Sequence, residues 1–254
     1  MIYIKNQKEI EKMREAGEIV KEIFREMEKA VKPGVTTLEL DEMVMKIIKK
    51  HNAKPSFVGV PSIYGGKPYY KHATCMSVND AIIHGIPNNR KLEEGDVLCF
   101  DITVEKNGYC ADAGRTYGVG KVSKEAQRLI DTAKDAFFAA MEYAKEGYRI
   151  GDISNAIQTY VEKQGFSILR DFQGHGIGKE MHEDPGVPNE GQKGKGLRLK
   201  AGMGLAIEPM ITAGSSDYKI LDDKWTIVTK DGSLGAYYEN TIIITKNEPD
   251  ILTF

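Results

Sequence analysis

The sequence predicts an α+β fold built from two duplicated halves whose strands share one antiparallel sheet. Residues 32–53 match residues 145–166 at a constant offset of 113, and residues 92–102 align without gaps on residues 199–209. The first pair has the apolar spacing of a helix. The second pair has the short apolar run after a glycine that is typical of a buried strand. Helices followed by strands are therefore expected twice along the chain.

The two halves cover about residues 1–120 and 121–254. A chain of 254 residues can bury a substantial core, and no linker rich in proline, glycine or serine separates the halves. We therefore expect a single domain over residues 1–254, with strands from both halves in one sheet.

Each half is expected to open with two helices. Residues 7–30 carry apolar side chains at helical spacing, and a second helix is predicted from Thr36 to about residue 51, with Glu39 completing a capping box. In the second half, the first helix is predicted over residues 124–146. The repeat at 145–166 then supplies the second helix of that half.

The composition excludes several classes of protein. Hydrophobic residues make up 41% of the chain, charged residues 28%, and the formal net charge is −2, so neither nucleic acid nor a membrane is an expected partner. Three cysteines form no paired framework, which favours a reducing compartment. The N-terminal residues lack the apolar core of a signal peptide. We expect a cytoplasmic protein and, without an exposed heptad or apolar patch, a monomer.

Both aligned apolar runs end in a carboxylate, Asp101 in the first half and Glu208 in the second. Each has a later acidic partner. Asp112 lies across the hairpin signal Lys106-Asn107-Gly108, and Glu239 closes a segment that matches the one ending at Asp112. Because buried carboxylates repel one another, two converging pairs of acids imply divalent cations as shared counter-charges.

His175 is the candidate nitrogen ligand. It lies within Gly174-His175-Gly176-Ile177-Gly178, where glycines let backbone and ligand approach closely. A lone histidine is most often structural, but the glycine frame and the converging acids favour a metal ligand here. Imidazole added to carboxylates suits manganese, iron, cobalt or zinc better than calcium. The predicted metal centre comprises Asp101, Asp112, His175, Glu208 and Glu239.

Two further histidines echo one another. His84 precedes Gly85-Ile86-Pro87 in the first half, and His182 precedes Glu183-Asp184-Pro185 in the second. Because His175 suffices as the nitrogen ligand, both are free to support the ligands or to act on substrate. Either ring could donate a hydrogen bond to a developing oxyanion or accept one from an amide. The alternative is a pair of turn histidines before prolines.

Other hydrolytic and nucleotide-binding motifs are absent from the sequence. It contains no GxSxG elbow, no HExxH helix and no Walker A segment. The glycines around His175 do not form a dinucleotide-binding fingerprint. Metal-assisted hydrolysis is therefore the chemistry that the motifs favour.

These motifs together resemble the type I methionine aminopeptidases, dinuclear metallopeptidases of the pita-bread fold. The resemblance extends over nearly the whole chain and implies an α+β fold with a pseudo-two-fold axis, in which helices cover a central curved antiparallel sheet. All five ligand positions of the family hold the expected residue type, which implies an active enzyme. The most specific marks are His84-Gly85-Ile86-Pro87, Asp101 with Asp112, Gly174–Gly178, Ile207-Glu208-Pro209-Met210, and the strand with Glu239 before Thr241.

The resemblance also implies a role for each residue. Asp101 chelates one of two divalent cations (Co, Mn, Fe or Zn), Asp112 and Glu239 bridge both, and His175 and Glu208 complete the other site. Water activated there attacks the first peptide bond of a polypeptide with an N-terminal methionine, and small second residues are preferred. In this scheme Glu208 is the base, His182 stabilises the oxyanion and His84 holds the leaving amide nitrogen.

The family resemblance places Tyr70, Cys75 and Trp225 near the methionine pocket, although core packing explains Trp225 equally well. Residues 54–72 are interrupted by prolines and glycines, and they form either a surface loop or a loop that lines the pocket. Three departures from the family pattern concern the shape of the pocket: Tyr237 replaces a common glutamine, Asn240 a histidine, and Met181 an aromatic residue.

The family implies nascent polypeptides as substrates and contact with the ribosome near its exit tunnel. Two alternatives stay open. One is a related peptidase that cleaves Xaa-Pro bonds, and the other is a non-catalytic binding protein on the same fold. The sequence does not identify the physiological metal.

Overall fold

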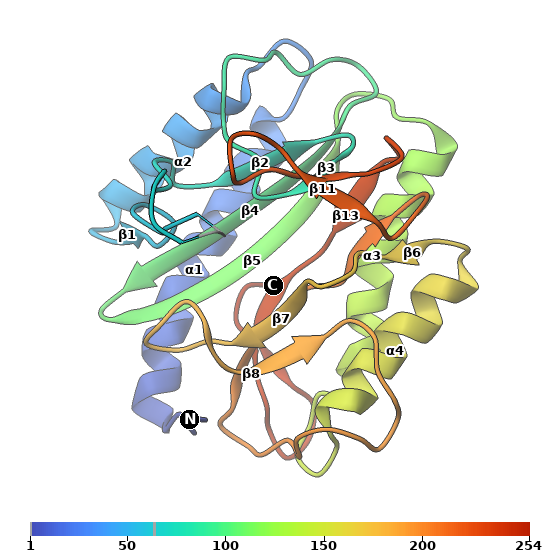
Figure 1. The fold of residues 1–254 in the computed structure, drawn as a ribbon. Coiled ribbons are helices and arrows are strands. Elements are labelled where there is room, and N and C mark those ends of the chain that lie inside the picture. The colour runs from blue at the N-terminus through green and yellow to red at the C-terminus, as the bar shows by residue number, and fades with distance from the viewer. Residues whose placement is uncertain (1, 63–64) are drawn as a thin grey trace.

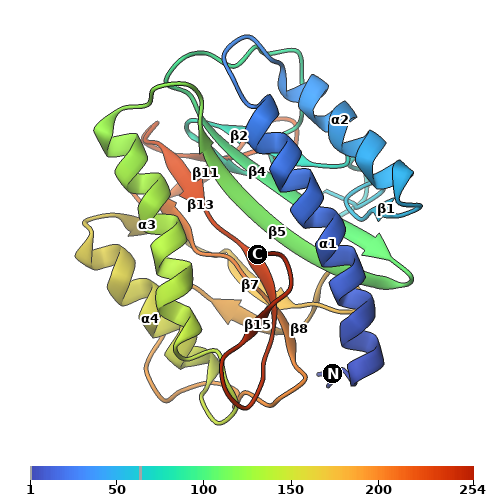
Figure 2. The ribbon, with the colours of Figure 1, turned by 180° about the vertical axis from the view of Figure 1, so that it is seen from behind.

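The computed structural model describes residues 2–62 and 65–254. Two helices lie in each half, and together they cover one side of the strands (Figure 2). No helix in the described part of the chain is long and apolar enough to cross a membrane. The helices are α1 (Gln7–Ala30), α2 (Thr37–Lys50), α3 (Lys124–Met141) and α4 (Ile150–Lys163).

The predicted helices of the first half are confirmed. α1 has the predicted bounds, and α2 begins after Thr36, whose side chain accepts a hydrogen bond from the Glu39 N–H in a capping box. The prediction for α3 is too long, because this helix ends at Met141. The Glu146 N–H donates to the Thr245 carbonyl oxygen at 2.8 Å instead of continuing the helix.

The duplication is visible in the backbone. Both bounds of α4 lie 113 residues after those of α2. Gly34 and Gly147 occupy matching positions before these helices, with φ of 92° and 96°. Each donates its N–H to the carbonyl oxygen of a matching leucine, Leu92 for Gly34 and Leu199 for Gly147. The two internal repeats therefore fold alike and pack alike.

The strands of the described residues form four antiparallel sheets, and β4, β5, β13, β7 and β8 can be followed across the molecule in Figure 1. The hydrogen-bonded orders are β1-β4-β2 with β5 beside β4, β13-β10-β6, β11-β12-β3, and β15-β14-β9-β7-β8. The strands are β1 (Lys54–Pro55), β2 (Cys75–Val78), β3 (Ala81–Ile83), β4 (Val97–Lys106), β5 (Tyr109–Gly118), β6 (Ser167–Ile168), β7 (Gln173–Gly176), β8 (Glu183–Pro188), β9 (Gly204–Ile207), β10 (Met210–Thr212), β11 (Tyr218–Ile220), β12 (Ile227–Thr229), β13 (Gly235–Tyr237), β14 (Asn240–Ile243) and β15 (Asp250–Ile251).

The β4–β5 hairpin places two acids on one face. Asn107 and Gly108 form its two-residue turn, with φ of 52° and 78°, as expected for the primed turn that this dipeptide favours. Asp101 pairs with Gly114 and Thr103 pairs with Asp112, so the two acids are diagonal neighbours.

Alternation along β4 decides which way Asp101 points. Leu98, Phe100 and Ile102 belong to the core that packs against α1 and α2, and the Phe100 ring lies 6.0 Å from that of Phe24. Because successive side chains of a strand point to opposite faces, Asp101 projects away from the helices.

The two halves meet where β5 lies beside the junction of β13 and β14. The Glu239 N–H donates to the Gly114 carbonyl oxygen at 3.0 Å, and the Gly114 N–H donates back to the Glu239 carbonyl oxygen at 3.3 Å. A further link joins β12 to β3. Strands from the two halves are therefore hydrogen-bonded to one another, as predicted, but they are divided among four sheets instead of forming the single sheet that was predicted.

Two threonines complete this seam symmetrically. The Thr116 hydroxyl donates to the Tyr237 carbonyl oxygen and accepts from its N–H, at 2.8 and 3.0 Å. Thr241 does the same with the Asp112 backbone, at 2.9 and 2.8 Å. Tyr237 is therefore the counterpart of Asp112. The sequence match that paired Asp112 with Glu239 is two residues out of phase with the structure.

Candidate metal centre and substrate pocket

All five predicted metal ligands line one cavity of about 360 Å³. They come from both halves: β4 and β5 carry two acids, β7 carries the histidine, and the other two acids interrupt the second-half strands. These residues are Asp101, Asp112, His175, Glu208 and Glu239.

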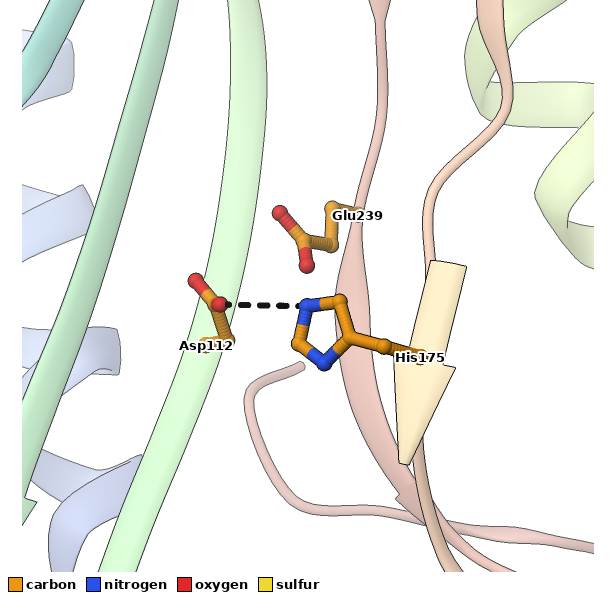
Figure 3. A group of neighbouring side chains, drawn as sticks. All are labelled: Asp112, His175 and Glu239. Atoms are coloured by element: carbon orange, nitrogen blue, oxygen red, sulfur yellow. Dashed lines mark ion pairs between the residues drawn. The ribbon is translucent and has the colours of Figure 1, made fainter. Parts of the chain in front are cut away.

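The ligand atoms converge without touching. The His175 Nε2 atom lies 3.7 Å from Asp112 Oδ2 and 3.7 Å from Glu208 Oε1. One ligand atom each from Asp112, His175 and Glu239 lie within 4.8 Å of one another. Figure 3 shows these three side chains pointing into a common space from three different strand segments. This separation leaves room for a cation between them.

The ring of His175 is oriented for ligation. Its Nδ1 lies 2.9 Å from the carbonyl oxygen of Gly176. Because a carbonyl only accepts, Nδ1 carries the proton and the Nε2 lone pair faces the acids. Burial, together with the nearby His182 ring, lowers the pKa of His175 to about 3, so the imidazole is neutral at neutral pH.

The acids destabilise one another in the absence of a counter-charge. Burial, reinforced by the neighbouring carboxylates, raises the pKa of Asp101, Glu208 and Glu239 well above their ordinary values. Burial raises the pKa of Asp112 to about 7. Bound cations reverse this cost, because they favour the ionised form.

The donor set fits divalent cations. Asp101 Oδ1 and Asp112 Oδ1 are buried and have no hydrogen-bond partner among the described residues. Such atoms are costly unless a cation or another donor meets them. Four carboxylates with one imidazole match manganese, iron, cobalt or zinc.

The two echoing histidines reach the same cavity. His182 lies at its exposed rim, with its ring centroid 4.4 Å from that of His175 in an edge-to-face arrangement. His84 has a φ of 58°, the left-handed region that non-glycine residues seldom adopt. Burial, with His182 nearby, lowers the pKa of His84 to about 4, and desolvation at the cavity wall lowers that of His182. Both rings are neutral at neutral pH.

The residues expected near a methionine pocket form one buried cluster in the cavity wall. Tyr70, Cys75 and Trp225 are 3–6% exposed, and the two rings lie 4.9 Å apart. The Tyr70 hydroxyl donates to the carbonyl oxygens of Thr74 and Gly85, at 2.9 and 3.0 Å. The phenol is therefore satisfied by backbone, and its ring presents an apolar surface.

Other lining residues were not predicted, or were predicted only in part. Phe57, Val60 and Pro61 line the cavity, so the loop at 54–72 contributes to the pocket; its residues 63 and 64, including Tyr64, lie outside the described residues. Phe172 also lines the cavity, and its ring lies 6.3 Å from His84. No local pattern in the sequence marks these residues as pocket residues.

Two of the three departures from the family pattern line the cavity, namely Met181 and Tyr237. Tyr237 is 1% exposed, and its ring covers Gly114, where an added Cβ would lie 2.1 Å from the Tyr237 Cε2 atom. Asn240 points elsewhere, and its Oδ1 accepts a hydrogen bond from Arg115 at 2.8 Å. Two of the three expected departures therefore lie inside the pocket, and the third lies beside it.

Comparison with known proteins is consistent with this site. Residues 11–246 match metallopeptidase family M24. The chain belongs to this family. It is 52% identical to a methionine aminopeptidase from Clostridium acetobutylicum, over 100% of this chain and 99% of the relative, and 46% identical to methionine aminopeptidase 1 from Bacillus subtilis, again over 100% and 99%. The predicted family resemblance is confirmed.

Solved structures of related proteins have the same fold. The crystal structure of methionine aminopeptidase from Rickettsia prowazekii is 40% identical and superposes with a TM-score of 0.94, with 100% of each chain covered. The pita-bread fold is confirmed. A prolidase from Pyrococcus furiosus shares the fold with a TM-score of 0.79 at 24% identity, but this chain covers only 65% of that protein.

Proposed function

We propose that the protein removes the N-terminal methionine from polypeptides, with a preference for small second residues. The observation that carries this proposal is a single cavity in which acids and histidines from both halves face an apolar cluster. The cluster suits a flexible apolar side chain, and the acids suit a metal-assisted hydrolysis beside it. The full-length likeness to methionine aminopeptidases supports the same substrate.

The metal centre is proposed to hold two divalent cations, of cobalt, manganese, iron or zinc. Asp101 would bind one cation, Asp112 and Glu239 both, and His175 with Glu208 the other. Bound there, cations supply positive charge that lowers the pKa of water and polarises the first peptide carbonyl. The orphaned oxygens of Asp101 and Asp112 support this assignment.

Three side chains are proposed to carry the chemistry. Glu208, whose carboxylate lies in the cavity, accepts the proton of the attacking water. His182 donates a hydrogen bond to the oxyanion of the tetrahedral intermediate, which a neutral imidazole can do through its N–H. His84 holds the amide nitrogen that leaves.

The methionine side chain is proposed to lie against Tyr70, Cys75 and Trp225. The Tyr70 and Trp225 rings are fixed by mutual packing, and the Tyr70 hydroxyl by its bonds to backbone. Rigid walls discriminate best by shape, because they cannot collapse around a smaller residue.

The remaining expectations concern the cell. We propose that residues 1–254 act as one catalytic domain and as a monomer in the cytoplasm. Its substrates are nascent polypeptides, which it meets near the ribosome exit tunnel. Failure to co-sediment with translating ribosomes at low salt would count against that contact.

Cleavage of Met-Ala-Ser tests the function directly. The chelated protein is assayed after addition of Mn²⁺, Co²⁺, Fe²⁺ or Zn²⁺, with an Xaa-Pro peptide as the competing substrate. Release of methionine that depends on cation is expected. Release from the Xaa-Pro peptide alone would indicate the related peptidase activity, and no release with bound cation would indicate a binding protein.

A further inference from the structure

The connection between β7 and β8 carries His182. Its Ile177 N–H donates to the Gly204 carbonyl oxygen at 3.1 Å, but among the described residues no backbone hydrogen bond between main-chain groups holds Met181 or His182 itself. Lys179, Glu180 and His182 are exposed. The Gly178 carbonyl oxygen accepts from the Cys110 N–H at 2.7 Å, and the Gly178 N–H donates to Glu180 at 3.2 Å. A side chain that acts on substrate must be held to within a fraction of an ångström, so this loop needs another constraint.

Glu183 supplies that constraint. Its Oε1 atom accepts from the backbone N–H groups of Lys179 and Glu180, at 2.8 and 3.3 Å. Its Oε2 atom accepts from Lys5 Nζ at 2.8 Å. The side chains of Lys5 and Glu183 are 4% and 7% exposed. The buried Glu183 carboxylate, next to His182, thus bonds both to the loop backbone and to the Lys5 ammonium group.

Lys5 is itself fixed to the second half of the molecule. Its N–H donates to the Gly202 carbonyl oxygen at 2.7 Å, and its neighbour Ile4 forms a bridge with Met203. Its stem packs on Gly178, where an added Cβ would lie 2.5 Å from the Lys5 Cε atom. Figure 1 shows the beginning of α1 close to the β7–β8 hairpin.

We propose that the buried Lys5–Glu183 ion pair is a positioning device that holds His182 at the rim of the active site. The segment before α1 thereby acts on the reaction through the His182 loop, without touching substrate. Loss of either partner leaves an uncompensated buried charge, which the loop can relieve only by moving. This inference rests on the proposed function of His182.

The test compares Lys5→Met and Glu183→Gln with the wild-type protein loaded with Mn²⁺. Glu183→Gln preserves side-chain length and Lys5→Met shortens the unbranched chain by one atom, so at least one variant is expected to fold. For Met-Ala-Ser, kcat is expected to fall up to about 100-fold with KM little changed, as for a misplaced catalytic group. Amide hydrogen exchange at Lys179 and Glu180 should rise in the same variants, and Mn²⁺ affinity should not change.

Three controls separate positioning from general stability. Lys5→Arg keeps the charge and should restore most of kcat. The double variant should be no worse than the more impaired single variant, since each change removes the same interaction. Arg14→Met breaks another ion pair of the N-terminal region, Arg14–Asp250 at the surface, and should leave kcat unchanged.

The outcomes distinguish this inference from the function on which it rests. If His182→Ala lowers kcat but Lys5→Met and Glu183→Gln do not, the positioning role is wrong. Unchanged exchange at Lys179 and Glu180 would overturn it as well. If His182→Ala keeps full activity, the proposed role of His182 itself is wrong.

Discussion

The two halves of the chain repeat one backbone but hold their acids differently. Asp101 lies inside the ten-residue strand β4, which continues into the hairpin turn. Its aligned partner Glu208 lies beyond the end of the four-residue strand β9. Pro209 follows Glu208 and has no N–H to continue the ladder. Asp101 is therefore an internal residue of its strand, as the predicted hairpin requires, whereas Glu208 follows the end of its strand.

A second contrast concerns matching positions on β2 and β7. Ser77 pairs with Cys99 as His175 pairs with Ala206. The Ser77 hydroxyl accepts from the Gly85 N–H at 2.9 Å, whereas His175 faces the acids. One position is thus structural in the first half and a candidate ligand in the second. The duplicated backbone therefore provides equivalent positions in the two halves, and the side chain at each position determines whether it can bind a metal.

The strongest test is to remove an acid from each half. Asp112→Asn and Glu239→Gln should each lower cleavage of Met-Ala-Ser by at least about 100-fold and weaken cation binding, because both halves share one metal centre. Asp131→Asn, at an exposed position on α3, is the control. Full activity of either site variant would show that the residue replaced is not an essential metal ligand.

Substitution of His84 or His182 should have a different effect from substitution of a metal ligand. His182→Ala removes the proposed oxyanion donor, a group typically worth about 3 kcal/mol, so turnover should fall about 100-fold. His84→Ala should also lower turnover. Cation affinity, measured by calorimetry, should stay unchanged in both variants. A drop in affinity would instead place the histidine among the ligands.

The metal centre should make the chelated protein less stable as pH rises. The folded state raises the carboxyl pKa values, to about 7 for Asp112, so it retains protons that the unfolded chain has released. That stability is complete below the unfolded pKa, near 4, and is lost as pH rises through the folded values. Tm should therefore fall as pH rises through about 7, and added Mn²⁺ should reduce the fall.

The histidines change stability with pH in the opposite direction to the carboxyl groups, and they do so over a different pH range. Burial lowers the pKa of His84 and His175 to about 4 and 3. Their contribution is present above the unfolded pKa, near 6.5, and is lost as pH falls through the folded values. They therefore do not affect the window above pH 6.5. A chelated protein whose Tm is flat or rising there would contradict the carboxyl shifts.

The seam between the halves should be equally sensitive from both sides. Thr241→Val and Thr116→Val each remove the hydroxyl that serves a backbone N–H and carbonyl of the other half. Leaving those buried groups unpaired should cost about 1–3 kcal/mol in the free energy of unfolding. Urea denaturation measures this cost, and a clear difference between the two variants would break the symmetry.

The smallest effect concerns the matching N-caps of α2 and α4. Thr36→Ala removes a side-chain acceptor and should cost about 1 kcal/mol. Arg149 holds the equivalent position, but its side chain has no acceptor for the helix N–H groups; its backbone N–H donates to the Asp152 carboxylate, and its guanidinium donates to the Gly196 carbonyl oxygen at an exposed site. Arg149→Ala should therefore cost much less. Equal costs would show that the Thr36 cap contributes nothing.

Local features account for what could be predicted along the chain. The bounds of α1, the Thr36 cap and the offset between α2 and α4 all follow from apolar spacing and capping residues within a few turns. The Asn107-Gly108 turn similarly brings Asp101 and Asp112 together, because a two-residue turn fixes the register of the strands that it joins.

Long-range contacts account for what could not be predicted. The register between β5 and the second-half strands is set by the backbone hydrogen bonds between Gly114 and Glu239. This register differs by two residues from the sequence match, which pairs Asp112 with Glu239. The Lys5–Glu183 pair joins residues 178 positions apart. Neither contact leaves a periodic or local signal in the chain.

The sequence alone determined the repeated elements, the residue types suited to a cation and the family, because each depends on neighbours along the chain or on a motif. The tertiary structure decided the shape of the pocket, the pairing of the halves and the anchoring of the His182 loop. These depend on packing between distant segments, where burial sets the cost of every unpaired polar group.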